Sequence, residues 1–357
     1  MYKYAHGGNA IYENGGENTI DLSANINPLG IPRNVKDALT REIPNSANYP
    51  DSASGKLREK ISAYENVAPE WIFCGNGASD IIFRLPRATQ AKKIMITAPT
   101  FSDYERAALS CGAEIHRHTL KAAAGFAVGS GFAEAARNEK PDLIYLCNPN
   151  NPTGKLIITG LIEEMLENSR KSNTHIAVDE CFLDFAEKAA EHTSKKLLKN
   201  YPNLIIIKAF TKLFALPGIR LGYAITSDET LIGRMHCHGP DWPVSNLAQA
   251  AGIAALEDAE NYVKQTVQYV SAERTKIEKE LHRLGYTVFK SEANYVFLQN
   301  PYPFDLREKL DKKGIRIRSC GNYSGLDGTY YRIAVSTKEN NAKLLTAIAE
   351  INGGKKQ

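Results

Sequence analysis

The sequence predicts an α/β protein with a large domain built on a mainly parallel sheet covered by helices, and a smaller α+β domain. From about residue 70 to residue 226, short apolar stretches alternate with stretches of helical periodicity. Nearly continuous apolar strands separated by helices are typical of a parallel sheet buried on both faces. After residue 245 this alternation gives way to one long helical stretch and then to shorter mixed segments. With 357 residues, the chain is long enough for a large core and a second, smaller one.

The large domain is expected to span residues 45–245. Its predicted strands are 93–98, 114–117, 143–147, 175–179, 204–208 and 222–226. Its predicted helices include 78–85, 102–108, 159–172 and 194–199. Because ligands of such sheets bind beyond the carboxyl ends of the strands, the residues that follow each strand are the candidates for function.

The remaining segments are expected to form the small domain and its N-terminal addition. Residues 1–44 are rich in Gly, Asn and Pro, and we expect them to pack on the small domain because they are too irregular for the large sheet. The small domain is expected to span residues 246–357. Its predicted elements are a helical stretch at 246–284, the segments 286–298, 304–313, 315–319 and 330–335, and a final helix.

The composition is that of a soluble globular protein, with 44 basic and 40 acidic residues and a formal net charge of +4. The basic residues are spread along the chain, which argues against nucleic acid binding. The six cysteines form no CxxC pair, so we expect them to be reduced, and we expect no metal at His236-Cys237-His238 because no second ligand cluster is visible. No signal peptide or membrane span is apparent, so a cytoplasmic location is expected.

Lys212 is the most informative residue. It follows an apolar strand, and the run 208–223 (KAFTKLFALPGIRLGY) places Arg220 eight residues later, beyond a Pro-Gly pair. A lysine held at the rim of a sheet beside fixed cations can lose its proton and attack an aldehyde. Most lysines are solvated surface charges, so this motif indicates a reactive lysine only in combination with the other motifs.

A glycine-rich turn at residues 74–80 (CGNGASD) opens a predicted helix. The backbone amides of Gly77, Ala78 and Ser79, with the Ser79 hydroxyl, can hold a phosphate at the positive end of the helix. Thr211 and Arg220, on either side of Lys212, can reach the same phosphate. A glycine turn with a serine cap is also a routine way to begin a helix.

Two further motifs end predicted strands. The heptapeptide NPNNPTG at residues 148–154 forms a rigid turn in which Asn151 can donate a hydrogen bond to a cofactor oxygen. Asp179 ends an apolar strand, where a carboxylate is costly unless it meets a cation such as a protonated pyridine nitrogen. An aspartate at that position is also a common helix cap. Phe101 can stack on a ring, although an isolated aromatic is more often part of a core.

Taken in this order, the motifs resemble those of fold type I pyridoxal phosphate (PLP) enzymes, and the match to the histidinol-phosphate aminotransferase group covers nearly the whole chain. NPNNPTG and TKLFALPGIRLGY carry the resemblance. It implies that Lys212 links covalently to PLP, that Asp179 pairs with the pyridine nitrogen, that Asn151 meets the 3-oxygen and that Phe101 stacks. Tyr49 resembles a tyrosine that reaches the cofactor phosphate of the neighbouring subunit, which implies a homodimer.

Within this group the chain is most similar to the threonine-phosphate decarboxylases, a family of cobalamin biosynthesis. The similarity lies in residues 6–9, 21–30 and 315–334, and in Phe182, where aminotransferases usually have a tyrosine. It implies that His6, Asn25 and Arg318 bind the substrate phosphate, that Arg332 binds the carboxylate, and that the reaction converts L-threonine O-3-phosphate to (R)-1-aminopropan-2-ol phosphate. The pair Ala78-Ser79 and Ser245 depart from the usual pattern of these decarboxylases.

Three alternatives stay open from the sequence. The first is an aminotransferase acting on histidinol phosphate or a related amino acid, and the second is a decarboxylase of serine phosphate. The third, a cofactor-binding module without catalytic activity, is disfavoured because every expected catalytic position is filled and no DNA-binding domain is present.

Overall fold

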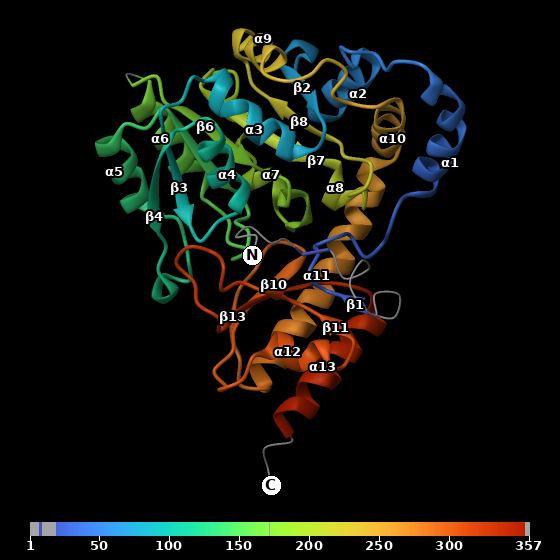
Figure 1. The fold of residues 1–357 in the computed structure, drawn as a ribbon, viewed down its shortest axis with the longest axis vertical. Coiled ribbons are helices and arrows are strands. Elements are labelled where there is room, and N and C mark those ends of the chain that lie inside the picture. Colours follow the sequence, from blue (N-terminus) through green and yellow to red (C-terminus); the bar gives the residue numbers. More distant parts are fainter. Residues whose placement is uncertain (1–6, 9–18, 171, 354–357) are drawn as a thin grey trace.

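The computed structural model describes residues 7–8, 19–170 and 172–353. Figure 1 shows a large upper lobe around one sheet and a smaller lower lobe, with α11 running from one lobe into the other. The large sheet has seven strands in the order β2-β8-β7-β6-β5-β3-β4. These strands are β2 (Ile72–Gly75), β3 (Lys93–Ala98), β4 (Glu114–Thr119), β5 (Leu143–Cys147), β6 (His175–Asp179), β7 (Leu204–Ala209) and β8 (Gly222–Ile225).

The large sheet is mainly parallel, as predicted. β4, β3, β5, β6 and β7 pair in parallel, whereas β8 is antiparallel to both β7 and β2. The expected strands 143–147 and 175–179 are buried along almost their whole length, which explains their continuous apolar sequences. The short strand β2 lies outside the prediction, because four residues give too weak a periodic signal.

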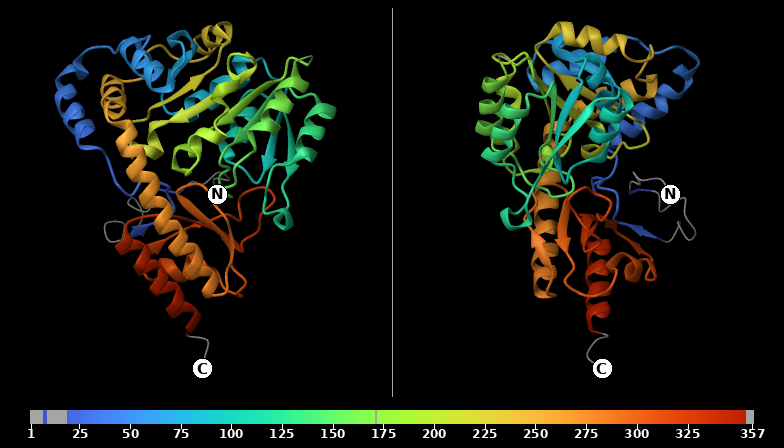
Figure 2. Two further views of the ribbon diagram at one scale, coloured as in Figure 1. Left: turned by 180° about the vertical axis from the view of Figure 1, so that it is seen from behind. Right: turned by 60° about the vertical axis from the view of Figure 1, so that its left-hand side comes forward.

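Helices cover both faces of this sheet, as the two views of Figure 2 show. Their bounds are α1 (Arg33–Glu42), α2 (Gly55–Glu65), α3 (Ala78–Ala88), α4 (Ser102–Ser110), α5 (Ser130–Glu139), α6 (Thr159–Ser169), α7 (Ala189–His192), α8 (Phe210–Leu213), α9 (Glu229–Cys237) and α10 (Asn246–Glu257). Buried residues of α3, α4 and α9 form one apolar core with the sheet, and those of α2, α5, α6 and α10 form another. The predicted helix at 194–199 is a short 3-10 turn, η7 (Ser194–Leu197).

The lower lobe contains a four-stranded antiparallel sheet in the order β12-β13-β10-β9, with a separate parallel pair β1-β11. The elements are β1 (Ile20–Asp21), α11 (Ala259–Arg283), β9 (Thr287–Phe289), β10 (Tyr295–Gln299), α12 (Leu306–Asp311), β11 (Ile315–Arg316), β12 (Arg318–Ser319), β13 (Tyr330–Ala334) and α13 (Lys338–Gly353). Buried residues of α11, α12 and α13 pack with these strands in a core of their own.

The expected helical stretch at 246–284 is present, but it is divided into two helices, because the chain leaves the helical conformation at Asp258 (φ −126°, ψ 31°) and forms α10 and α11. α10 packs on α1 and α2, and its buried alanines belong to the core of the large sheet. β1, by contrast, pairs with β11 of the lower lobe. The N-terminal segment therefore contacts both lobes, and the domain boundaries at residues 44 and 245 stay a prediction.

Candidate active site

A cavity of about 170 Å³ lies beyond the carboxyl ends of β5, β6 and β7. It brings together eleven of the residues predicted for function. They are Asn25, Ala78, Ser79, Phe101, Asn151, Asp179, Thr211, Lys212, Arg220, Arg318 and Arg332. Since these residues come from segments more than 300 positions apart, the fold alone assembles them.

Lys212 is a half-buried residue on α8, which follows directly from β7, and its side chain lines the cavity. Burial and the nearby guanidinium groups of Arg332 and Arg220 together lower the pKa of Lys212 to about 8, against the opposite effect of Cys181 and Asp179. The Nζ atom is 5.9 Å from the centre of the Phe182 ring. A substantial share of this amine is therefore neutral, and so nucleophilic, near physiological pH.

Asp179 ends β6 and is 5% exposed. Burial raises the pKa of its carboxyl, while hydrogen bonds from Cys181 and Tyr104 stabilise the ionised form and lower it. The backbone N–H of Cys181 donates to Oδ1 at 3.0 Å, and the Tyr104 hydroxyl donates to Oδ2 at 2.7 Å. Asp179 thus closes a local turn instead of capping a helix, since the next helical turn begins at Leu183, and it also presents a buried carboxylate to the cavity.

The glycine-rich turn and Arg220 meet at one end of the cavity. A Cβ atom on Gly77 would lie 2.7 Å from Nη2 of Arg220, so a side chain there would displace this guanidinium, and the φ of +82° favours glycine as well. Ser79 donates from Oγ to Asp103 Oδ2 at 3.1 Å, while Ala78 and Thr211 line the cavity beside it. The amides at the start of α3, the Thr211 hydroxyl and Arg220 form a cradle suited to a phosphate.

Arg332 of β13 reaches from the lower lobe into the same cavity. Its Nη1 donates to Asn151 Oδ1 at 2.5 Å, and its Nη2 donates to the Ser23 carbonyl at 2.7 Å. With its amide oxygen turned toward Arg332, Asn25 accepts from Nε and Nη1 at 3.2 Å each. Oδ1 of Asn151 is therefore used by Arg332, and Nδ2 is the atom that Asn151 offers to a ligand.

Arg318 of β12 is held from two sides. Its Nη2 donates to Asn322 Oδ1 at 2.8 Å, and its guanidinium carbon is 5.4 Å from the centre of the Tyr323 ring. Tyr323 also lines the cavity. Both residues come from the loop between β12 and β13, so this loop orients the arginine.

The charges of the lining residues indicate an anionic ligand. Lys212, Arg220, Arg318 and Arg332 are the basic side chains among them, and Asp179 is the acidic one. In the part of the chain that the structure describes, no group of three or more His, Cys, Asp or Glu side chains could hold a metal ion. No described helix is long and apolar enough to cross a membrane.

Three predicted residues do not line this cavity. Gly77 lies beside Arg220, directly before the lining residues Ala78 and Ser79 in the chain. Tyr49 is 81% exposed and stacks on Trp242, with ring centres 4.6 Å apart. His6 lies outside the described residues. The roles of Gly77, Tyr49 and His6 stay predictions.

Two functional candidates were missed by the sequence analysis. Tyr104 follows Phe101 by three residues, and this helical spacing could have suggested that both side chains lie on one face. Tyr323 belongs to the segment compared with the decarboxylases, but nothing in one sequence shows that its ring would lie beside Arg318. Cys147 and Cys181 also line the cavity, and burial raises the pKa of each thiol well above its ordinary value.

The environment of Lys212 predicts a measurable titration. In the protein freed of ligands, the rate of Lys212 acylation should rise with pH through a midpoint of about 8 and level off at higher pH, because the neutral amine reacts. Replacing Arg332 by methionine should raise this midpoint, since a nearby positive charge is lost. Peptide mass spectrometry after brief labelling gives both values, with surface lysines of the same sample as the reference. A midpoint equal to that of those surface lysines would contradict the proposed environment.

Comparison with known proteins agrees with this geometry. The chain is 34% identical to the threonine-phosphate decarboxylase of Salmonella typhimurium, over 99% of this chain and 98% of that protein. It superposes on a histidinol-phosphate aminotransferase from Clostridium acetobutylicum with a TM-score of 0.87 and 30% identity, covering 94% of this chain and 99% of that chain. A histidinol-phosphate aminotransferase from Sinorhizobium meliloti, solved in complex with pyridoxal-5'-phosphate, has the same fold, with a TM-score of 0.82, 21% identity, and coverage of 93% and 90%. The family model for aminotransferase class I and II matches residues 17–348, and the chain belongs to this family.

Proposed function

We propose that this protein is a PLP-dependent enzyme that decarboxylates L-threonine O-3-phosphate to (R)-1-aminopropan-2-ol phosphate, a step of cobalamin biosynthesis. One observation carries the proposal. Lys212 and Asp179 share a cavity with Arg318 and Arg332, so a reactive amine, a buried carboxylate and two anion-binding groups surround one small space. The likeness to the Salmonella decarboxylase over nearly the whole of both chains supports the same reaction.

The residues of the cavity fit PLP. This cofactor supplies an aldehyde for a covalent link to an amine, and a ring that accepts electrons from the substrate. Lys212 provides the amine, and the partly neutral state of Nζ favours the link. The start of α3, Thr211 and Arg220 would hold the phosphate, Asn151 would donate from Nδ2 to the ring oxygen, and Phe101 would contact the ring face.

Asp179 would hold the pyridine nitrogen in its protonated form. The donors Tyr104 and Cys181 N–H favour the ionised carboxylate, which offsets the cost of its burial. A positive charge on the ring nitrogen would stabilise this carboxylate further. The ring nitrogen would therefore offset part of the cost of burying this carboxylate.

The two arginines would orient the substrate. Arg318, with Asn25 and His6, would bind the phosphate, and Arg332 would bind the carboxylate. A substrate anchored at both ends would be held with its carboxylate in one fixed orientation, and the cofactor would supply the electron sink for loss of carbon dioxide. Lys212 Nζ, in its protonated form, would donate a proton to Cα in place of the carbon dioxide that leaves.

The competing proposal is an aminotransferase for histidinol phosphate or a related amino acid, supported by the likeness to the Clostridium enzyme. Phe182 favours decarboxylation by resemblance. Its ring lines the cavity, is 6% exposed and contacts Tyr295 edge-on at 5.2 Å, so this wall offers no hydroxyl group from residue 182. The choice between threonine phosphate and serine phosphate rests on one methyl group, worth about 1–3 kcal/mol in a pocket.

The decisive assay compares two products. With PLP and threonine phosphate, the protein should release carbon dioxide, and with histidinol phosphate and 2-oxoglutarate it should form little glutamate. Lys212→Ala should reduce carbon dioxide release by at least about 10²–10⁴-fold, the usual contribution of a positioned proton donor. It should also lose the absorbance of the covalently linked cofactor. Glutamate formation as the faster reaction would instead establish the aminotransferase.

Arg318 is predicted to select phosphorylated substrates. Arg318→Met should raise the KM for threonine phosphate by roughly 10–100-fold, as expected for the loss of a charged hydrogen bond worth about 1.5–3 kcal/mol. The matched control is Arg316→Met, because Arg316 lies two residues earlier and pairs with Asp311 instead of lining the cavity. Steady-state kinetics with both variants measure the effect, and an unchanged KM in Arg318→Met would refute the phosphate clamp.

We further propose a homodimer in which Tyr49 reaches the neighbouring active site. Tyr49 and Trp242 form a stacked aromatic pair, and Trp242 is 45% exposed. Ile43 nearby in the sequence is 60% exposed, so three large apolar side chains face outward in this region. Light scattering should give twice the mass of the 39.4 kDa chain, and an active monomer would rule the arrangement out.

A further inference from the structure

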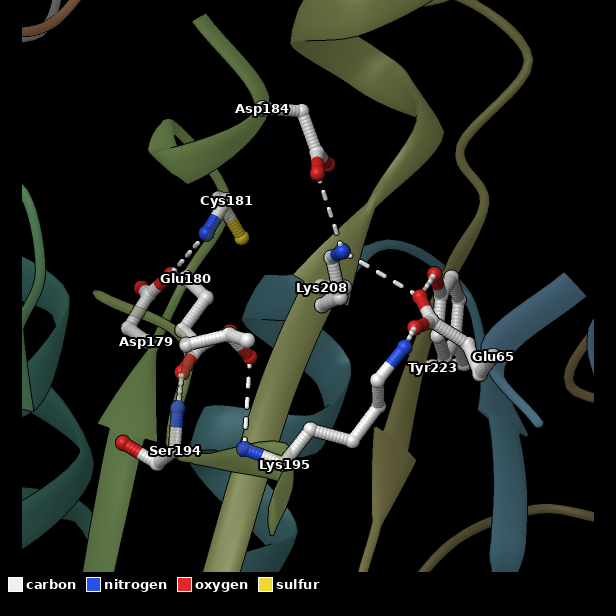
Figure 3. Close-up of polar contacts among 10 residues, drawn as sticks. Glu65, Asp179, Glu180, Cys181, Asp184, Ser194, Lys195, Lys208 and Tyr223 are labelled. Carbon is white, nitrogen blue, oxygen red and sulfur yellow. Dashed lines mark hydrogen bonds and ion pairs between the residues drawn. The ribbon is translucent and has the colours of Figure 1, made fainter. Parts of the chain in front are cut away.

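A second cluster of charged residues lies behind the active site and is drawn in Figure 3. Lys208 of β7 is at its centre. Its Nζ atom lies 3.1 Å from Glu65 Oε1, at the end of α2, and 3.1 Å from Asp184 Oδ1, in the 3-10 turn η6 (Leu183–Phe185). Lys208 therefore connects three separate segments through charged hydrogen bonds.

Further partners complete the cluster around Glu65. The Tyr223 hydroxyl of β8 donates to Glu65 Oε1 at 2.5 Å, and Lys195 Nζ lies 2.9 Å from Oε2. Burial by itself would raise the pKa of Glu65, but Lys208 and Lys195 outweigh it and lower the pKa to about 2. Glu65 is thus a buried carboxylate that remains ionised because two lysines surround it.

Glu180 is another buried acid of this region. It accepts from the backbone N–H of Ser194 at 2.7 Å and from the Thr193 hydroxyl at 2.8 Å. Burial raises the pKa of Glu180 to about 7, even though Lys208 acts in the opposite direction. The direct hydrogen-bond partners of Glu180 are neutral groups of Thr193 and Ser194. Glu180 is therefore not one of the acids to which Lys208 is bonded, and the bonds of Lys208 go to Asp184 and Glu65.

The two segments joined by the Lys208–Asp184 pair are those that carry the key groups of the cavity. β7 continues directly into α8, so Lys212 lies four residues after Lys208. Asp184 belongs to the segment that leaves β6 at Asp179 and passes through Phe182. The last residue pair between β6 and β7 is Asp179 with Ile207, and a final backbone hydrogen bond joins Glu180 to Ile207. Past this point the two segments are no longer paired in the sheet, and the ion pair of Lys208, one residue further along β7, joins them (Figure 3).

We propose that Lys208 is a positioning residue, whose ion pair with Asp184 holds Lys212 at its working distance from Phe182 and Asp179. This inference rests on the proposed function of Lys212. The side chain of Lys208 is 10% exposed, so water competes little for the pair and its geometry is well defined. Small displacements of a reacting group have large effects on rate, so a tie of this kind acts on turnover more than on substrate binding.

The test separates positioning from stability. Asp184→Asn replaces the partly exposed acid by a neutral side chain of equal size, and it leaves the Lys208–Glu65 pair in place. We expect a loss in kcat of about ten-fold or more, with the KM for threonine phosphate changed by less than about two-fold. We also expect a shifted pH midpoint of Lys212 acylation in the ligand-free protein. Lys208→Arg, which keeps a cation facing Asp184, should retain most of the activity.

Lys195→Met is the matched control, because Lys195 also pairs with Glu65 but does not contact Asp184. It should lower the unfolding temperature while leaving kcat and the Lys212 midpoint unchanged. The inference is overturned if Asp184→Asn lowers only the unfolding temperature, or if Lys195→Met changes the Lys212 midpoint equally. Acylation of Lys212 requires no substrate, so this outcome is independent of whether threonine phosphate is the correct substrate.

Discussion

The parallel pairing of β6 with β7 is the constraint on which the active site depends. Asp179 lies opposite Ile207 in this pair, and Cys147 of β5 lies opposite Asp179. Because all three strands run in one direction, the residues that follow them leave the sheet at the same edge. Asn151, Asp179 and Lys212 follow β5, end β6 and follow β7, respectively, so this pairing determines that they meet.

The second determinant is the balance of charge in the cavity. Burial lowers the pKa of Lys212, and Arg332 and Arg220 add to this effect. The same two guanidinium groups line the cavity and favour anionic ligands, so they contribute both to the reactive amine and to the anion-binding surface. Arg332 links these two roles, since it lies close enough to affect Lys212 and also orients Asn151.

The lower lobe contributes two of the basic residues that line the cavity. Arg318 and Arg332 lie on neighbouring strands, opposite each other in the β12–β13 pair. Such paired positions place both side chains on the same face of the sheet, directed toward the large lobe. In the proposed function, the groups that would hold the cofactor belong mostly to the large lobe, and the arginines that would hold the substrate belong to the lower lobe.

The sequence alone determined the α/β class, the positions of the main strands along the chain and most of the cavity residues. These features depend on local signals: continuous apolar runs, glycine turns, and polar residues placed directly after strands. It did not reveal the break at Asp258, the short strand β2, or the partners Tyr104 and Tyr323, because none of these has a distinctive local pattern. Only the tertiary structure decided the Lys208 cluster, since its charged side chains come from residues 65, 184, 195 and 208, which are far apart in the chain. These charges interact strongly only when folding brings them together and removes them from water.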